Sequence, residues 1–412
     1  MDTAIFMKKR TLSMVAALII CICAGVGYAW SVLQTPIIAA HHWPDKQVSL
    51  TYTITVLCST MAPLLFGSVI RKLSTRTAVT LGAVLFGAGL FLTGWMGSGV
   101  WQLYLFYGVL SGLGTGFIYP TLMAYVVRLY PDRSGMASGL GTAAYGSGAI
   151  FWAPVAAALI EGSSLRTAFS VLGAGFFVII LAGTLLLREP PENLRQMLHV
   201  SSDAKVEDAH GINLRRSEMV KTLPFYMMVL IFTCGLVAGV IVISQASPIL
   251  QSGYGFTAPR AAVFVSVFAA CNMAGRFLWG SLSDKMGIRS VMIAVFALCI
   301  CSMTVLAQAN NTVVAILAMA VAASCYGGFA SVLTPLTAKV FGAKYVTENY
   351  GVMYIVFGLA SLIGPVLAVQ LKNEATGSYT GAFIAAGVLA LLGLIGTIAV
   401  KLRVKKEDCN EQ

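Results

Sequence analysis

The chain alternates long apolar runs with short polar breaks, and this pattern continues from one end to the other. A helix needs about 20 apolar residues to cross the hydrocarbon core of a bilayer. Twelve runs reach that length, at residues 11–33, 48–70, 77–97, 101–126, 136–160, 168–187, 222–247, 259–282, 288–308, 312–338, 348–370 and 378–401. The pattern therefore predicts an all-α membrane protein with twelve transmembrane helices.

One long polar stretch separates the sixth run from the seventh. It begins near Pro190 and Pro191 and carries both acidic and basic residues. We interpret residues 188–221 as a cytoplasmic linker. It would join an N-terminal six-helix bundle, residues 1–187, to a C-terminal six-helix bundle with a short cytoplasmic tail, residues 222–412.

The two halves repeat each other. A Gly-Ser pair follows the second run at Gly67 and the eighth run at Gly280, 213 positions later. Three residues of the fifth run recur 211 or 212 positions later in the eleventh, namely Gly139, Gly146 and Pro154 as Gly351, Gly358 and Pro365. Two pseudo-symmetric bundles are typical of transporters that work by alternating access, with the substrate held near the membrane midplane.

Charge supports the membrane assignment and sets an orientation. Only 10% of the residues are charged, against about 25% in soluble domains. The net charge is +11, and 22 of the 27 Lys and Arg fall in segments on the same side as the N-terminus. The positive-inside rule then places both termini in the cytoplasm. We expect a monomer that lies in the lipid bilayer of a bacterial inner membrane. We expect no nucleic acid among its partners.

Arg276 lies inside the eighth apolar run. A charge near the bilayer centre costs roughly 2.5–3.5 kcal/mol on insertion scales, so such residues usually face a cavity and act on a ligand. The planar guanidinium fits a carboxylate through two hydrogen bonds. Asn272 is one helical turn earlier on the same face. Together these two residues predict a site for a small organic anion.

Tyrosines recur in the middle of the runs, where a hydroxyl needs a hydrogen-bond partner. These are Tyr28, Tyr119, Tyr145, Tyr326 and Tyr354. Tyr145 has glycine-rich neighbours, which also fit a packing role.

The loop after the eighth run reads GSLSDKMGIR, from Gly280 to Arg289. It resembles the G-x-x-x-D-[RK]-x-G-x-[RK] signature of the major facilitator superfamily. In the first-half copy of this loop, Arg71 stands where the Asp belongs. In the loop after the eighth run, the carboxylate of Asp284 can accept hydrogen bonds from helix N-termini. Lys285 and Arg289 can pair with nearby carboxylates. We expect a conformational latch formed by Gly280, Asp284, Lys285, Gly287 and Arg289.

Within that superfamily, residues 25–31, 272–276 and 349–354 resemble the bacterial oxalate/formate antiporter family and the related monocarboxylate transporters. The resemblance covers essentially the whole chain. It implies that Arg276 binds the substrate carboxylate and that tyrosines line the cavity. The substrate-binding residues expected on these grounds are Arg276, Asn272, Tyr119, Tyr326, Tyr28 and Tyr354.

Two departures from the family narrow the substrate. Oxalate carriers of the family have a Lys in the eleventh span, where this chain has Val356 or Phe357. One buried cation would leave the second charge of a dicarboxylate without a partner in a low dielectric, which favours a monocarboxylate. Animal monocarboxylate transporters have an Asp where this chain has Asn272, and the amide cannot hold a proton.

The sequence lacks the motifs of several other classes of protein function. The sequence has no Walker-type phosphate loop and no H-E-x-x-H, and its Cys and His have no zinc-site spacing. We therefore expect no enzyme activity, no catalytic residues, no metal and no cofactor.

We predict a secondary transporter of a small monocarboxylate of the lactate, pyruvate or formate class, coupled to a proton. The alternative is exchange of carboxylates, as in an oxalate/formate-type antiporter. A drug/proton antiporter ranks lower because Ala153 precedes Pro154, so the G-x-x-x-G-P motif is absent. A transport-inactive carboxylate sensor also ranks lower, because the linker is short.

Overall fold

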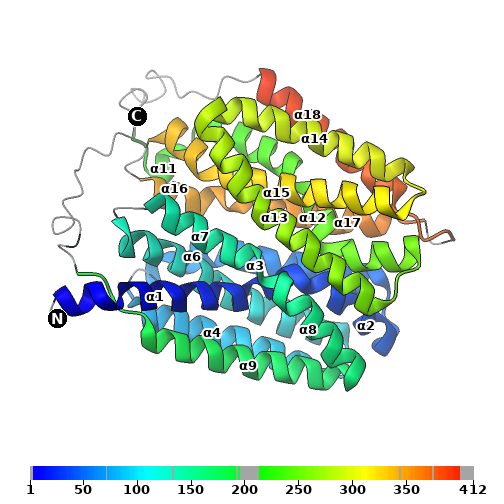
Figure 1. Cartoon of the computed structure of the whole chain (residues 1–412), viewed down its shortest axis with the longest axis horizontal. Coiled ribbons are helices and arrows are strands. Elements are labelled where there is room, and N and C mark those ends of the chain that lie inside the picture. Colours follow the sequence, from blue (N-terminus) through cyan, green and yellow to red (C-terminus); the bar gives the residue numbers. More distant parts are fainter. Residues whose placement is uncertain are drawn as a thin grey trace. The chain divides into compact units, whose positions relative to one another are not determined.

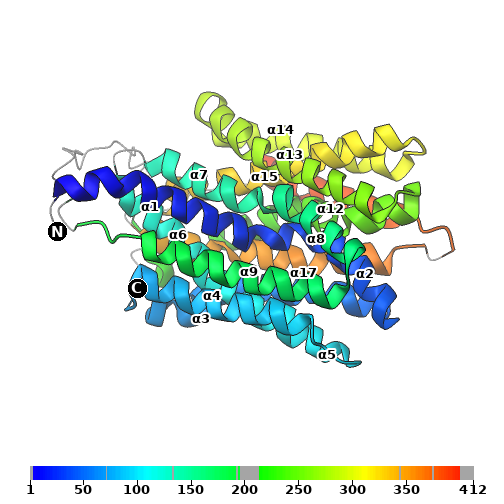
Figure 2. The same ribbon diagram turned by 60° about the horizontal axis from the view of Figure 1, so that its bottom comes forward.

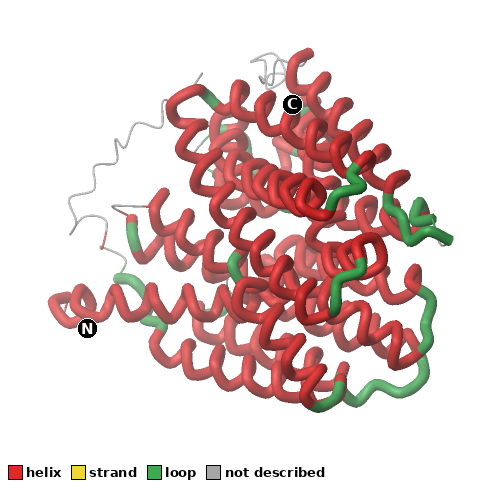
Figure 3. Tube along the Cα trace, turned by 45° about the vertical axis from the view of Figure 1, so that its right-hand side comes forward, coloured by secondary structure: helices red, strands yellow, loops and turns green. Residues whose placement is uncertain are grey.

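The computed structural model describes residues 3–70, 72–131, 134–191, 194, 213–342, 345–373 and 375–399. These residues form helices and loops and include no strand (Figure 3). Twelve helical segments among them are long and apolar enough to span a membrane, which confirms the predicted fold class. Arg71, most of the predicted linker (192–193 and 195–212) and residues 400–412 lie outside the described residues.

The first six spans are coloured blue to green in Figure 1. Their elements are α1 (Thr3–Ala24), the 3-10 segment η1 (Gly25–Ala29), α2 (Trp30–His41), α3 (Asp45–Ile70), α4 (Thr75–Thr93), α5 (Val100–Leu103), η2 (Tyr104–Ser111), α6 (Gly112–Leu129), α7 (Ser134–Gly146), α8 (Gly148–Gly162) and α9 (Leu165–Leu186).

The last six spans follow a one-turn helix, α11 (Arg216–Met219). They consist of α12 (Leu223–Tyr254), α13 (Ala258–Met286), α14 (Ile288–Gln308), α15 (Thr312–Phe341), α16 (Val346–Met353), α17 (Ile355–Gln370) and α18 (Thr380–Ala399).

The chain divides into two compact units. Unit 1 comprises Met1–Ser202 together with Ala246–Gln251 and Gly255–Ala270, and unit 2 comprises Asp203–Gln245, Ser252–Tyr254 and Cys271–Gln412. Unit 1 therefore includes the first part of α13, where Ser266 Oγ donates to the carbonyl of Ala149 at 3.1 Å. The domain boundaries drawn from the sequence stay a prediction.

Equivalent helices pair in the same way in each unit. The third span, α4, packs along the sixth, α9, and the ninth, α14, packs along the twelfth, α18. Figures 1 and 2 both show α4 and α9 running side by side. This matching supports the repeat that the glycine and proline positions predict.

Four of the described spans change geometry in mid-course. The first changes to 3-10 geometry at Gly25–Ala29, and the fourth changes to π-helical geometry at Tyr104–Ser111. The fifth breaks at Ser147, and the eleventh breaks at Tyr354. In the first span, a Cβ at Gly25 would lie 3.1 Å from the Cα of Gly148, and the breaks of the first and fifth spans pack together. Broken helices expose backbone polar groups, so transporters place them around ligand sites.

Candidate functional site

Arg276 occupies the second half of α13 and is 8% exposed. Its Nε donates to Oδ1 of Asn272 at 3.4 Å. Asn272 is 1% exposed and lies one turn earlier on the same helix. The two residues that the sequence pairs by helical spacing therefore contact each other, and this contact directs one edge of the guanidinium toward Asn272.

A close crossing of α13 and α15 holds this pair in place. A Cβ at Gly327 would collide with the carbonyl oxygen of Asn272 and lie 3.0 Å from the backbone nitrogen of Arg276. A Cβ at Gly275 would collide with the carbonyl oxygen of Ser324. Glycine at both positions lets the backbones approach, as small residues do at membrane helix interfaces. The indole of Trp279 then donates to Ser324 Oγ at 3.2 Å.

Aromatic rings gather elsewhere in unit 2 around Phe357. The ring centroids of Tyr326 and Phe357 are 5.9 Å apart, and those of Tyr354 and Phe357 are 5.0 Å apart. Phe357 is 6% exposed, and Tyr326 is 5% exposed. Tyr354 stands at the break between α16 and α17. The structure thus brings two predicted tyrosines onto one phenylalanine.

Unit 1 holds a second aromatic cluster, at the breaks of the first and fifth spans. Tyr145 is central, because its ring centroid lies 4.2 Å from that of Tyr119 and 5.5 Å from that of Tyr28. We refer to Tyr28, Tyr119 and Tyr145 as the tyrosine cluster.

Sequence reasoning missed part of this cluster. It left Tyr145 out of the binding set because of its glycine neighbours. Tyr145 stands within an apolar run, so a hydroxyl inside such a run was the available signal. Its contacts with Tyr119 and Tyr28 come from the packing of separate spans, which spacing along one chain segment does not reveal.

The predicted latch residues occupy the end of α13 and the start of α14. Asp284 and Lys285 are exposed, and Gly287 has a φ of +82°, which favours glycine. Arg289 donates to the carbonyls of Thr397 at 3.3 Å and Ile398 at 2.5 Å. The sequence suggested a carboxylate partner for Arg289, whereas the structure gives it the C-terminal carbonyls of α18. These carbonyls attract a cation because they form the negative end of the helix dipole.

The first half contains the same contact. Arg76 lies 213 positions before Arg289, at the start of α4. It donates to the carbonyls of Leu187 at 2.6 Å and Leu185 at 3.1 Å, at the end of α9. In each half, therefore, an arginine caps the last span from the start of the third.

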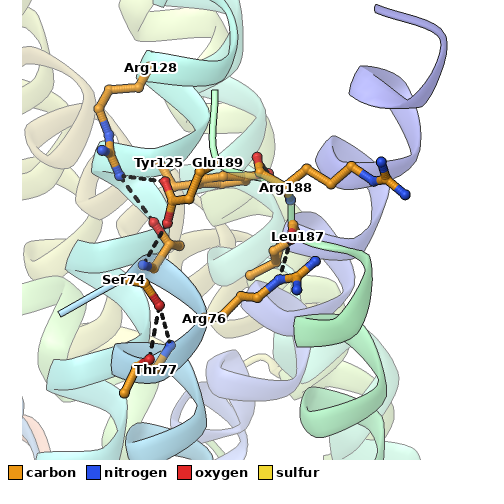
Figure 4. A network of polar contacts seen from close by, with 9 residues as sticks. Ser74, Arg76, Thr77, Tyr125, Arg128, Leu187, Arg188 and Glu189 are labelled. Carbon is orange, nitrogen blue, oxygen red and sulfur yellow. Dashed lines mark hydrogen bonds and ion pairs between the residues drawn. The ribbon is translucent and has the colours of Figure 1, made fainter. Parts of the chain in front are cut away.

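A polar network surrounds the end of α9 (Figure 4). Glu189 accepts a hydrogen bond from the backbone nitrogen of Thr75 at 2.7 Å, at the N-terminus of α4. Arg128 lies 3.7 Å from the Glu189 carboxylate and 3.1 Å from Thr75 Oγ1. Tyr125 donates to the carbonyl of Arg188 at 2.9 Å. Glu189 was not among the sequence candidates, although it supplies a carboxylate at a helix N-terminus.

Comparison with known proteins covers nearly the whole chain. The family model described as Major Facilitator Superfamily matches residues 15–365 and 227–411. A relative from Escherichia coli K12, the "uncharacterized MFS-type transporter YhjX", is 26% identical over 358 residues, which is 87% of each chain. The oxalate:formate antiporter of Oxalobacter formigenes is 25% identical over 368 residues, covering 87% of this chain and 84% of its own.

Monocarboxylate transporter 12 of the mouse is 25% identical over 385 residues, covering 87% of this chain and 78% of its own. Among solved structures, a D-xylose–proton symporter superposes with a TM-score of 0.74 at 16% identity, covering 98% of this chain and 99% of that one. The resemblance drawn from the loop signature and the three passages is thereby confirmed.

Proposed function

This chain belongs to the major facilitator superfamily, and we propose that it transports a small monocarboxylate, together with a proton, by alternating access. The proposed substrates are lactate, pyruvate and formate. The observation that carries the proposal is a buried arginine, Arg276, held by Asn272 well inside a membrane-spanning helix.

The chemistry of this pair suits a carboxylate. With Nε directed to Asn272, the two Nη groups form the edge that can grip both carboxylate oxygens. A bound anion offsets the charge of the arginine, which lowers the free energy needed to enclose it in a low-dielectric interior. Substrate binding would in this way favour the reorientation that carries the anion across.

A monocarboxylate fits unit 2 better than a dicarboxylate does. Phe357, one of the two positions assigned to the family's second cation, lies among the rings of Tyr326 and Tyr354. Val356, the other position, is fully buried. Neither side chain can neutralise a second carboxylate. We further assign Tyr119 and Tyr28 of the tyrosine cluster to the substrate pathway, because they surround two helix breaks.

The decisive experiment is uptake into proteoliposomes. Lactate, pyruvate, formate and oxalate would each be offered to the purified full-length protein, with and without a pH gradient. Uptake of monocarboxylates that rises when the outside is acidic supports proton symport. Uptake that needs a carboxylate inside the vesicle supports exchange, the second candidate, which the 25% identity to an oxalate:formate antiporter favours.

The variant that tests the central residue is Arg276→Gln, which keeps hydrogen-bonding capacity and removes the charge. We expect it to insert normally and to lose at least about 90% of the uptake, because the desolvated anion no longer has a cation. Uptake at the wild-type rate would remove Arg276 from the proposal.

A further inference from the structure

Residues 213–219, which come shortly before the seventh span, contact two other spans of unit 2. The backbone nitrogen of Leu214 donates to the carbonyl of Phe341, the last residue of α15, at 2.9 Å. The carbonyl of Leu214 accepts a hydrogen bond from Nδ2 of Asn349, in α16, at 3.0 Å. Figure 1 shows α11 beside α16, and the two are in contact. Leu214 therefore ties the end of the tenth span to the start of the eleventh. We refer to residues 213–219 as the strap.

The strap has a folded shape of its own. The backbone nitrogen of Arg215 donates to Oε2 of Glu218 at 2.6 Å, which closes the turn of α11. Met219, at the end of that turn, is fully buried, and Leu214 is also buried. The guanidinium carbon of Arg215 lies 5.5 Å from the ring centroid of Tyr345, within the range of a cation–π contact. The strap is therefore attached by two hydrogen bonds, two apolar side chains and one ring contact.

The helix that the strap holds, α16, lies between two interruptions of the chain. It is eight residues long. Gly342 precedes it with a φ of +94°, which favours glycine, and the eleventh span breaks after it at Tyr354. Hinges are a few residues at the ends of elements that absorb changes of backbone angle. A short helix between two such points can change its direction while the rest of the span, α17, stays in place.

The hydrogen bond at Asn349 attaches the strap without holding it tightly. The side chain is fully buried, and its Oδ1 has no hydrogen-bond partner among the residues that the structure describes. The carbonyl of Leu214 fixes this orientation of the amide, because only the NH₂ end can donate to it. An unsatisfied buried acceptor costs free energy of the same order as one hydrogen bond contributes. The gain at Nδ2 is therefore largely offset by the cost at Oδ1.

We propose that the strap is a reversible restraint on α16. While attached, it holds the tenth and eleventh spans together at this end, and its release lets α16 turn about the break at Tyr354 during transport. The inference rests on the proposed function only in taking this motion to be part of the transport cycle. Release breaks both hydrogen bonds of Leu214 and lets water reach Asn349, so that Oδ1 gains the partner it lacks in the attached state. Asn349 is a positioning residue in this proposal.

Trypsin cleavage of the purified full-length protein measures whether the strap is attached. Cleavage after Arg215 and Arg216, identified by fragment mass, reports the population in which this segment is open. Asn349→Leu removes the amide at similar volume, and Leu214→Pro removes the N–H that donates to Phe341. Each variant should be cleaved about fivefold faster than the wild type, because each loses one attaching hydrogen bond.

Uptake of labelled lactate into proteoliposomes measures what release does to transport. Both variants should take up lactate about twofold faster or more at unchanged affinity, because a conformational step then proceeds without the restraint. The double variant should be no faster than the faster single variant, since both changes cut the same attachment. Thr337→Val is the matched control, because Thr337 is fully buried near the end of α15 and donates to Leu333 of its own helix at 2.7 Å. It should keep the wild-type rates of cleavage and uptake.

The outcomes separate this proposal from the proposed function. Wild-type cleavage rates in both variants would overturn the attachment. Faster cleavage with equal or slower uptake would overturn the restraint, because it indicates a contact that only supports the fold. If the wild type takes up none of the four acids while both variants are cleaved faster, the proposed function fails and the attachment of the strap stands.

Discussion

Arg276 carries a positive charge inside a membrane-spanning helix. Its charge is costly inside a bilayer, and the structure offsets that cost locally by giving it the amide oxygen of Asn272 at 3.4 Å. The two glycines at the crossing of α13 and α15 hold the backbones of both residues close to α15. Under the proposed function, the guanidinium would therefore be in position before the substrate arrives, which would reduce the entropy lost on binding.

The aromatic environment of Phe357 leads to a prediction about charge selectivity. Phe357→Lys should raise the affinity for oxalate relative to lactate, by about tenfold, because a second cation would pair with the second carboxylate. Val356→Lys is the comparison, since Val356 is fully buried one position away. Competition by oxalate against labelled lactate measures both. No gain in oxalate competition in either variant would count against assigning the second cation of the family to this position.

The contact between Arg276 and Asn272 could be predicted from the sequence, for a physical reason, whereas their role in substrate binding stays a prediction. Arg276 stands out because a charge in an apolar run is expensive, and Asn272 follows from helical spacing. The tyrosine cluster was predicted less well, because it depends on which faces of separate spans meet. The sequence shows that Tyr145 lies within an apolar run, but not that its ring packs against those of Tyr119 and Tyr28.

At the scale of the helices, the repeated arginine contact leads to a prediction about stability. Arg289→Gln should lower the stability of the protein by about 1 kcal/mol, because α18 loses a charged cap on its final carbonyls. The value is modest because Arg289 is exposed, where solvent screens the charge. Arg76→Gln should have a similar effect through α9. Unfolding temperatures in detergent would measure both variants, and a fall of about 1 °C is expected.

Arg289→Lys is the informative control for this contact. It keeps the positive charge but lacks the fork that reaches two carbonyls at once, so its stability should lie between those of wild type and Arg289→Gln. If Arg289→Gln is as stable as the wild type, the contact with α18 contributes nothing measurable.

Hydropathy predicted the existence of the spans but not their interruptions. The 3-10 segment Gly25–Ala29 and the break at Ser147 lie within runs that stay apolar throughout, so a count of apolar residues passes over them. The glycines at 25 and 148 were the available signal, because a Cβ at either position would collide with backbone. The presence of a glycine in an apolar run does not show whether it allows close helix packing or interrupts the helix. That depends on the span packed against it.

For the molecule as a whole, the distribution of charge predicts the orientation in the membrane. Segments with 22 of the 27 Lys and Arg should face the cytoplasm, which places α11 inside and the turn between α8 and α9 outside. Ser163 and Ser217 are exposed residues in these two places. A cysteine at Ser163 should therefore react with a membrane-impermeant maleimide added to intact cells, whereas a cysteine at Ser217 should react only after the membrane is opened.

The two cysteine variants are made in the otherwise unaltered protein. The native cysteines that the structure describes lie inside spans and should react weakly with the reagent. Labelling of Ser217→Cys in intact cells would reverse the assigned orientation. If the reagent reaches Ser163→Cys but not Ser217→Cys in intact cells, an odd number of spans must separate these two positions. The span between α8 and the start of the linker is α9. The same pair of variants therefore tests the membrane crossing of α9 and the cytoplasmic position of the segment that joins the two halves.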